Sequence, residues 1–557
     1  MRYSWPYTTT LLIALETTAA QRVIQGSVQH FQSEATGPWQ PLLALGFGSP
    51  PQEITGIFDS GSSDTIIPQA GSKLCQVENQ QCTDGAEIVR GEFDEQLTSD
   101  VEELPGQEFE AGFSGGDEFN GEYIKTTVTV ITPDGTGASN GTGRLSGADG
   151  AGGAGNVTGE EVPNAQVALA SDGQPSGDFP QFAIYGVGPR EAEATDKKYD
   201  NLPQVMKDTG VTKGNSYSVV MNPTPLANGS VFFGGVDRSK FTGELQQVPI
   251  DRTTDGKISD FVVKMSSIRL DMSGGNNQTR RLTRSEKREH MRLKRSIFRR
   301  TAPRNKGYSK AKGKYGGGDE TGEEDVQAAR VLSAGEGGHN SNSKGQGNNR
   351  NSNNGGNCCS CSCNNNNGDN GDNGDNGDNG RDNRNKDKGN KNQGSSNNGS
   401  GKSGSGLIDL GLNKKNAFTL FDTGGVALTL PANVLRKMAR ALDTDFSDEF
   451  GELGPVDCGL LSAGNKLVMG FNNDRVQTTL ALDKIRISDE IADPRLTQEG
   501  LCEVGAFASA PDENLNSMGF VYFTDVYTVF DLENNSLWFA QATGDPGAPG
   551  EQLEEFP

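Results

Sequence analysis

Two short motifs in this chain join an acidic residue to a hydroxyl residue and a glycine. One begins at Asp59 (Asp-Ser-Gly-Ser) and the other at Asp422 (Asp-Thr-Gly-Gly). Each follows an apolar run and precedes a second apolar run that ends in proline, at Pro68 and Pro431. Such a run predicts a strand, and the glycine predicts a tight turn. Two such turns predict two carboxylates brought to one site by two similar halves.

Paired carboxyl groups can divide the work of an acid and a base. Two Asp side chains a few ångströms apart do not easily ionise together, so they share a proton over a broad acidic range. The ionised group can take a proton from a water that attacks a peptide carbonyl, while the protonated group donates to the developing oxyanion. This chemistry needs neither a metal nor a covalent intermediate, so we expect no cofactor and no metal at the site.

Histidine is scarce, with copies at His30, His290 and His339. The last two fall in a low-complexity region, which leaves only His30 for a Ser-His-Asp or Cys-His arrangement. A zinc site of the usual His-rich kind is supplied equally poorly. The scarcity of histidine therefore favours carboxylate chemistry.

The elements that must position the two motifs read as strands separated by turns. Residues 36–270 and 407–542 carry short apolar and β-branched runs punctuated by Gly, Pro and Asp, a pattern typical of β structure. Helix-like stretches are few, at 202–209 and 434–442. We therefore expect a mostly β protein in two halves.

The boundaries follow from shifts in composition. We expect a signal peptide at 1–20, an N-terminal β lobe at 21–272, a disordered low-complexity insertion at 273–406, a C-terminal β lobe at 407–542 and an acidic tail at 543–557. The insertion is rich in Gly, Asn and Asp, and cannot bury enough apolar surface to offset chain entropy.

Charge is divided unevenly along the 557 residues. The chain has a net charge of −23, but the insertion at 273–406 carries 24 Lys and Arg against 14 Asp and Glu, so the remainder carries −33. A phosphate backbone would be repelled by so acidic a body, which argues against a nucleic-acid partner. The excess of carboxylates suits work at low pH, and solubility alone is the alternative interpretation.

Several features predict secretion. Arg2, the apolar stretch at 8–15 and the small residues at 18–20 resemble a signal sequence, and no other stretch is long enough for a membrane span. Medium, cell wall and vacuole remain open as destinations. Six Asn-x-Ser/Thr sequons predict a glycoprotein; they begin at Asn140, Asn156, Asn228, Asn277, Asn398 and Asn534.

Four cysteines lie outside the low-complexity insertion, at Cys75, Cys82, Cys458 and Cys502. An even number in a secreted chain favours disulfides over free thiols. The first two are close in sequence and should close a small loop. The other two flank a strand-rich segment.

The order of several motifs resembles that of the pepsin-like aspartic endopeptidases of the fungal secreted type. Besides the two Asp motifs, the resemblance includes residues 45–52 (Leu-Gly-Phe-Gly-Ser-Pro-Pro-Gln), 233–237 and 529–535. It covers about two thirds of the chain. It implies a bilobal fold with the active-site cleft between two β lobes, catalysis by Asp59 and Asp422, and a disulfide between Cys458 and Cys502.

The chain departs from the family pattern at three positions around the expected site. Ile66 stands where the family has Trp, and Phe113 stands at the flap tyrosine in the hairpin at about 109–123. Gly425 replaces the hydroxyl residue that would bond the outer oxygen of the second Asp, whereas Ser62 keeps that role for the first. Thr423 completes the expected surroundings of the pair.

These departures leave two functions open. The first is a secreted aspartic endopeptidase with an acidic pH optimum that acts on proteins or peptides. The second is a catalytically weak or inactive peptide-binding pseudoprotease on the same fold, and a structural wall protein is a distant third. We expect a monomer, or a two-chain form if a processing protease cuts at the basic pairs of residues 280–300.

Overall fold

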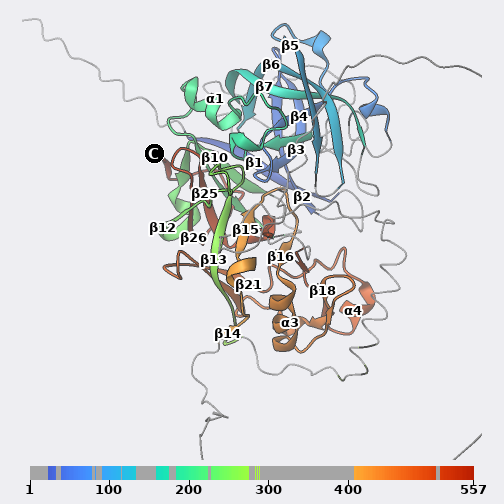
Figure 1. Ribbon diagram of the computed structural model, residues 1–557, viewed down its shortest axis with the longest axis vertical. Helices are drawn as coiled ribbons and strands as arrows, with labels where there is room; N and C mark the ends of the chain where they lie inside the picture. The colour runs from blue at the N-terminus through green and yellow to red at the C-terminus, as the bar shows by residue number, and fades with distance from the viewer. Residues whose placement is uncertain are drawn as a thin grey trace, which may run out of the picture. The chain divides into compact units, whose positions relative to one another are not determined.

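The computed structural model describes residues 23–32, 39–77, 82, 91–113, 116–132, 159–174, 183–223, 228–274, 407–509 and 515–556, together with positions 283, 285 and 288. The expected signal peptide and nearly all of the expected insertion lie outside these residues. Within them the protein is mostly β (Figure 1). None of the described helices combines the length and the apolar character that crossing a membrane requires.

A sheet of 13 strands joins the first half of the chain to its end, in the order β12-β26-β25-β9-β10-β1-β2-β3-β8-β4-β7-β6-β5. Along the chain these strands are β1 (Ile24–Gln32), β2 (Trp39–Phe47), β3 (Gln52–Asp59), β4 (Thr65–Pro68), β5 (Glu102–Gly112), β6 (Glu118–Ile131), β7 (Gly159–Gln174), β8 (Ala183–Gly186), β9 (Ser216–Met221), β10 (Gly229–Phe233), β12 (Phe241–Pro249), β25 (Val526–Asp531) and β26 (Ser536–Ala542).

A sheet of 10 strands carries the second motif. Its members are β13 (Val262–Asp271), β14 (Leu407–Asp409), β15 (Phe418–Phe421), β16 (Leu428–Leu430), β17 (Phe446–Ser447), β18 (Glu452–Leu453), β20 (Lys466–Phe471), β21 (Val476–Ala481), β23 (Ala506–Ala508) and β24 (Leu515–Met518). Two further pairs join β11 (Gly235–Asp237) to β27 (Leu553–Glu555), and β19 (Val456–Asp457) to β22 (Leu501–Cys502).

The helices are short. They are α1 (Leu202–Asp208), α3 (Ala432–Ala441) and α4 (Pro494–Gln498), with 3₁₀ turns that include η3 (Arg190–Ala192) and η7 (Phe520–Thr524). The first two coincide closely with the stretches expected to be helical. On α3 the buried residues recur at Val434, Leu435 and Met438, the spacing of one helical face.

Both Asp motifs lie in the same arrangement of strands. In the first half, β8 runs parallel to β3, which ends at Asp59, and antiparallel to β4, which follows the motif. In the second half, β24 runs parallel to β15, which ends just before Asp422, and antiparallel to β16. β4 and β16 each have a further parallel neighbour, β7 and β23. The two motifs therefore occupy equivalent turns.

Aromatic rings from distant parts of the chain anchor the first of these turns. Tyr217 of β9 stacks on Phe530 of β25 with a centroid distance of 4.8 Å, and meets Phe58 of β3 edge-on at 5.6 Å. All three side chains are buried. Large buried aromatic side chains contribute strongly to the stability of a core. Because Phe58 directly precedes Asp59, this cluster fixes the strand that delivers the first carboxylate.

The last residues of the chain, expected to be an acidic tail, are held against the body. β27 pairs with β11, and Phe556 is buried beside Trp538 of β26, with a ring-centroid distance of 5.4 Å. The hydroxyl of Ser230 donates to the Pro546 carbonyl at 2.6 Å, and the Lys240 ammonium donates to the Asp545 carbonyl at 2.7 Å. The segment is therefore an integral part of the fold.

Two disulfides lie within the described residues. Cys75 bonds to Cys82, seven residues away, and Cys458 bonds to Cys502, 44 residues away. Each joins two positions in the same half of the chain. Their presence agrees with an oxidising compartment.

A buried carboxyl group, Asp64, lies five residues after the first Asp of the motif. One of its oxygens accepts hydrogen bonds from the hydroxyls of Tyr123 and Tyr199, at 2.8 and 2.7 Å. The other accepts from the backbone N–H of Ala194 at 2.7 Å. Burial raises the pKa of Asp64, and these hydrogen bonds oppose the rise.

A second buried carboxyl group, Glu193, lies next to this network. Its side chain is fully buried, and its Oε2 accepts from the Tyr199 backbone N–H at 2.8 Å. Its Oε1 has no hydrogen-bond partner among the described residues. Burial, with a contribution from the nearby Asp64 charge, raises the pKa of Glu193 to about 8. The fold therefore holds Glu193 as a neutral acid below neutral pH.

Glu193 should make the protein less stable as the pH rises. Its pKa is about 8 in the folded state against 4.5 unfolded, so the stability it contributes is complete below pH 4.5 and is lost as the pH rises toward 8. Glu193→Gln keeps the shape without the titration. The free energy of unfolding of the parent should fall between pH 5 and pH 8. In the variant this fall should be smaller by roughly 3 kcal/mol, as measured by urea unfolding at both pH values.

The matched control is Glu110→Gln, at an exposed position of β5. This variant should follow the parent at both pH values. An equally steep loss of stability in Glu193→Gln and the parent would contradict the assignment.

Candidate active site

The two Asp turns hold each other through reciprocal buried hydrogen bonds. The backbone N–H of Ser60 donates to the Thr423 hydroxyl at 2.9 Å, and the backbone N–H of Thr423 donates to the Ser60 hydroxyl at 2.9 Å. Each hydroxyl then donates to a carbonyl of the opposite strand, Ser60 to Phe421 and Thr423 to Phe58, both at 2.8 Å. Residues more than 360 positions apart are thus locked in register.

Glycine makes the close approach of the two turns sterically allowed. A Cβ atom at Gly61 would lie 2.8 Å from the carboxyl carbon and Oδ1 of Asp422, and 3.1 Å from Oδ1 of Asp59. A Cβ at Gly424 would lie 2.7 Å from Oδ1 of Asp59. Real Cβ contacts are longer than 3.0 Å. The inner oxygens of both carboxyl groups therefore occupy the space that side chains would take.

The two carboxyl groups differ in their hydrogen bonds. Asp59 receives the Gly61 N–H on Oδ1 at 2.8 Å and the Ser62 hydroxyl on Oδ2 at 2.5 Å. Asp422 receives the N–H groups of Gly424 and Gly425 on Oδ1, at 3.0 and 3.1 Å. In the described part of the chain, no hydroxyl or N–H donates to Oδ2 of Asp422. The negative charge is therefore better stabilised on Asp59.

The pKa of Asp422 also indicates that the two carboxyl groups are unequal. Burial, followed by the charge of Asp59 and a hydrogen bond with it, raises the pKa of Asp422 well above its ordinary value. The two N–H donors oppose this rise without cancelling it. Asp422 is thus the carboxyl group of the pair whose surroundings favour its protonated form. The pair as a whole, rather than either group alone, takes up and releases this proton.

Two of the expected departures from the family pattern meet in one hydrophobic cluster. Ile66 is buried in a cluster with Phe119, and the half-buried Phe113 packs against it. Phe113 meets Phe119 edge-on at 5.9 Å. Because both substituted side chains are apolar, their replacement leaves no hydrogen-bond donor buried without a partner.

Backbone hydrogen bonds tie the second turn to the segment after β24. The N–H of Asp422 donates to the Met518 carbonyl at 3.1 Å, and the N–H of Phe520 donates to the Gly425 carbonyl at 2.7 Å. The ring of Phe520 in turn lies 5.0 Å from that of His30. The turn is therefore braced from both halves of the chain.

His30, the one histidine considered for a nucleophilic triad, is buried in β1. Burial lowers its pKa to about 4, with the backbone of Asn222 partly opposing the change. In the described residues no Ser, Thr or Cys side chain is hydrogen-bonded to either ring nitrogen. Among the described residues, His30 therefore has no nucleophile to activate.

One cluster in the described residues has side-chain ligand atoms close enough for a metal, at Cys75, Cys82 and Glu92. The two sulfurs are joined in a disulfide, so neither is a thiolate. This cluster does not fit a metal site.

Sequence reasoning missed the buried Asp64 network and Glu193. The partners of Asp64 lie 59, 130 and 135 residues away. Local pattern gives no signal for such contacts. An acidic residue set directly before the apolar run that ends at Pro68 was the one available sign that Asp64 would be buried.

Two carboxyl groups on equivalent glycine turns, braced against each other, define the class of aspartic proteases. The model of the family described as eukaryotic aspartyl protease matches residues 42–137, 138–281 and 402–542, more than half of the chain. The chain belongs to this family. Its mostly β fold is that of the pepsin-like aspartic proteases, as the sequence predicted.

Individual relatives match over shorter stretches. The probable aspartic-type endopeptidase OPSB of Arthroderma benhamiae is 26% identical over 230 residues, which is 40% of this chain and 39% of the relative. Secreted aspartic protease 7 of Candida albicans is 27% identical over 214 residues, 38% of this chain and 30% of the relative. The matches thus span less than half the length of these curated relatives.

Among solved structures, the aspartic proteinase from Irpex lacteus superposes with a TM-score of 0.49 at 13% sequence identity. The superposition covers 93% of this chain and 98% of that one.

The hydroxyl of Thr423 should stabilise the whole fold. Thr423→Val keeps the side-chain shape, but removes the acceptor for the Ser60 N–H and the donor to the Phe58 carbonyl. Both partners are then buried without a hydrogen bond. We expect a loss of about 2–3 kcal/mol in the free energy of unfolding, measured with urea at pH 5.

Thr419→Val is the matched control. Thr419 is equally buried, and its hydroxyl makes one local hydrogen bond to the Ala417 carbonyl at 3.2 Å. The free energy of unfolding of Thr419→Val should be lower than that of the parent by only about 1 kcal/mol. Equal losses in the two variants would show that the bridge between the turns adds no stability.

Proposed function

We propose that this protein is an aspartic endopeptidase with an acidic pH optimum, in which Asp59 and Asp422 act as one catalytic pair. The observation that carries this proposal is the direct contact of the two carboxyl groups on mutually braced turns. Membership of the family makes peptide-bond hydrolysis the chemistry to test first.

The hydrogen bonds and the pKa of Asp422 support unequal roles for the two groups in this proposal. Asp59, with donors on both of its oxygens, is the general base that takes a proton from a water held between the carboxyl groups. Asp422, whose pKa is raised, is the acid that donates a proton to the oxygen of the scissile carbonyl. The substrate would be an extended peptide lying between the two halves, with Phe113 on the flap above it.

An acidic optimum follows from the shared proton. The reaction requires Asp422 to remain protonated, and its raised pKa extends the pH range in which this holds. The net charge of −23 adds to this preference, because mutual repulsion among the carboxylates falls as they are protonated.

Secretion fits the same proposal. The two disulfides and a relative named as a secreted aspartic protease support export of this chain. The expected signal sequence at 1–20 would direct it. A monomer, or a two-chain form after cleavage in the expected insertion, remains the proposed state.

A pseudoprotease that binds peptides without cleaving them is the second candidate. It is favoured by Gly425, which leaves Oδ2 of Asp422 without a hydroxyl donor among the described residues, and by Phe113, whose side chain has no hydrogen bond to give. These differences bear on the rate and not on the contact between the two carboxyl groups, so we rank the endopeptidase first.

Asp59→Asn should abolish cleavage, because an amide cannot accept the proton of the water. At pH 3–5, cleavage of a denatured protein substrate should fall by at least about a hundredfold and the parent should be inhibited by pepstatin. Asp445→Asn, at an exposed position, is the control and should retain full activity. A folded parent that binds peptides but cuts none between pH 2 and pH 7 would favour the pseudoprotease.

Restoring a hydroxyl at position 425 should change the pH range of activity. A Cβ at Gly425 would lie 3.1 Å from Oδ2 of Asp422, so the hydroxyl of Gly425→Ser can donate to that oxygen. This bond stabilises the ionised form and lowers the pKa of Asp422. The alkaline limb of the kcat/KM profile should therefore move down by about one pH unit.

Gly425→Ala fills the same space without a hydroxyl and is the matched control. Its profile should keep the alkaline limb of the parent. An identical shift in the Ser and Ala variants would mean that crowding and not hydrogen bonding is responsible.

A further inference from the structure

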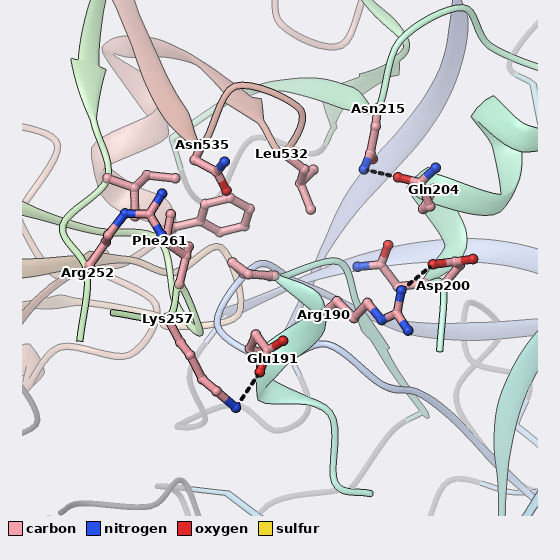
Figure 2. A pocket seen from close by; sticks show the side chains of 14 residues that line it. Arg190, Glu191, Asp200, Gln204, Asn215, Arg252, Lys257, Phe261, Leu532 and Asn535 are labelled. Carbon is pink, nitrogen blue, oxygen red and sulfur yellow. Dashed lines mark hydrogen bonds and ion pairs between the residues drawn. The ribbon is translucent and has the colours of Figure 1, made fainter. Parts of the chain in front are cut away.

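A cavity of about 370 Å³ lies apart from the two Asp motifs (Figure 2). None of its lining residues belongs to either motif. Four stretches of chain form it together with Asn215: residues 189–191, 200–204, 250–261 and 532–535. A volume in this range matches the smaller known ligand pockets.

The charges around the cavity are unusual for so acidic a protein. Three cations, Arg190, Arg252 and Lys257, line it together with two carboxylates, Glu191 and Asp200. Figure 2 shows that two of the cations are paired: Arg190 contacts Asp200 at 3.0 Å, and Lys257 contacts Glu191 at 2.9 Å. The local balance is therefore positive in a chain with a net charge of −23.

Arg252 is the third cation of the lining, and it is in neither of these two ion pairs. Its guanidinium donates to the Gly256 carbonyl at 2.9 Å, and no carboxylate of the described residues forms an ion pair with it. A guanidinium has five N–H donors in a planar fork, so most of those of Arg252 remain available. A carboxylate matches this fork in both charge and geometry.

Asn215 offers a complementary group. It is 8% exposed, and its side-chain N–H donates to Gln204 at 2.7 Å, which fixes the orientation of the amide. Its Oδ1 has no hydrogen-bond partner in the described residues. A buried acceptor without a donor is costly, and a ligand N–H would satisfy it.

The rest of the lining is apolar or amide. Ile250, Ile258 and Phe261 are buried, and Figure 2 places Phe261 and Leu532 between Arg252 and Asn215. The cavity thus offers a cation at one side, a hydrogen-bond acceptor at the other and apolar surface between them. An amino acid or a peptide end has its polar groups and side chain in that order.

We propose that this cavity is a binding site for the C-terminal carboxylate of a peptide or an amino acid, with Arg252 holding the carboxylate and Asn215 accepting an N–H. A terminal carboxyl group has a pKa of about 3.5, lower than that of Asp or Glu. At about pH 4 the chain terminus is mostly ionised, whereas a Glu side chain is mostly protonated. The difference in ionised fraction favours chain ends over acidic side chains by about twofold near pH 4.

This site is independent of the proposed catalysis, although peptide products would be its natural ligands. The test uses the full chain carrying Asp59→Asn, with pepstatin present to occupy the catalytic region. The probe is N-acetyl-trialanine with a free carboxylate, compared with its C-terminal amide by isothermal titration calorimetry at pH 5. We expect the amide to bind about tenfold more weakly.

Substitution of the protein should reproduce this difference. Arg252→Gln should weaken binding of the free acid about tenfold and leave the amide unchanged. Arg440→Gln, which removes an exposed cation on α3, should change neither. Equal binding of acid and amide, unchanged binding in Arg252→Gln, or no binding to the parent would each overturn the proposal.

Two further probes test the remaining parts of the proposal. A free acid whose amide nitrogens are methylated keeps the carboxylate but has no N–H for Asn215, so it should bind several-fold more weakly. If it binds as tightly as the unmethylated acid, the role of Asn215 is wrong. Free alanine, compared with the acetylated peptide, distinguishes the two sources: the tighter ligand identifies whether amino acids or peptide ends are bound.

Discussion

The exchange of hydrogen bonds between Ser60 and Thr423 is the interaction on which the rest of the site depends. Two carboxyl groups in contact repel each other as soon as both are ionised, and burial makes that repulsion stronger. The turns that carry them must therefore be held together by something other than the carboxyl groups. Four buried hydrogen bonds do this, two through backbone N–H groups and two through strand carbonyls. Because each hydroxyl both accepts and donates, neither turn can move without leaving groups on the other unsatisfied.

Burial shifts the equilibrium of several carboxyl groups in this molecule toward the neutral form. Asp422, Asp64 and Glu193 are all placed where burial raises their pKa values, but they differ in what surrounds them. Asp64 accepts hydrogen bonds from three donors, which stabilise its carboxylate form. Glu193 has one oxygen without a hydrogen-bond partner in the described residues, so its protonated form is favoured. At acidic pH the neutral Glu193 is compatible with a tightly packed core, and its ionisation as the pH rises toward 8 opposes that packing. Stability and the proposed chemistry thus favour the same conditions.

Local sequence pattern was informative where the chain itself determines the structure. The apolar runs before Asp59 and Asp422 form β3 and β15, and the helix-like stretches form α1 and α3. The hydroxyl and glycine residues of the motifs predicted tight turns, and the structure brings those turns together.

Local sequence pattern did not predict contacts between residues that are far apart in the chain. The hydroxyls that bind Asp64 lie on a strand and a loop far apart in the sequence, and the cavity beside Arg252 is assembled from four stretches of chain together with Asn215. The terminal segment looked like a tail because its charges outnumber Leu553 and Phe556, yet those two apolar residues pack against the body.

Strand pairing would hold together a chain that is cut between β13 and β14. Strands from before that point pair with strands from after it, β9 with β25, β12 with β26, β11 with β27 and β13 with β15. In the described residues each disulfide, by contrast, joins two cysteines on the same side of the cut, Cys75 to Cys82 before it and Cys458 to Cys502 after it. Neither of these two disulfides would link the fragments, yet each fragment would supply strands that the other needs to complete its sheets. Such a nicked molecule would be a heterodimer made from one gene product, in which shared sheets rather than the described disulfides hold the fragments together.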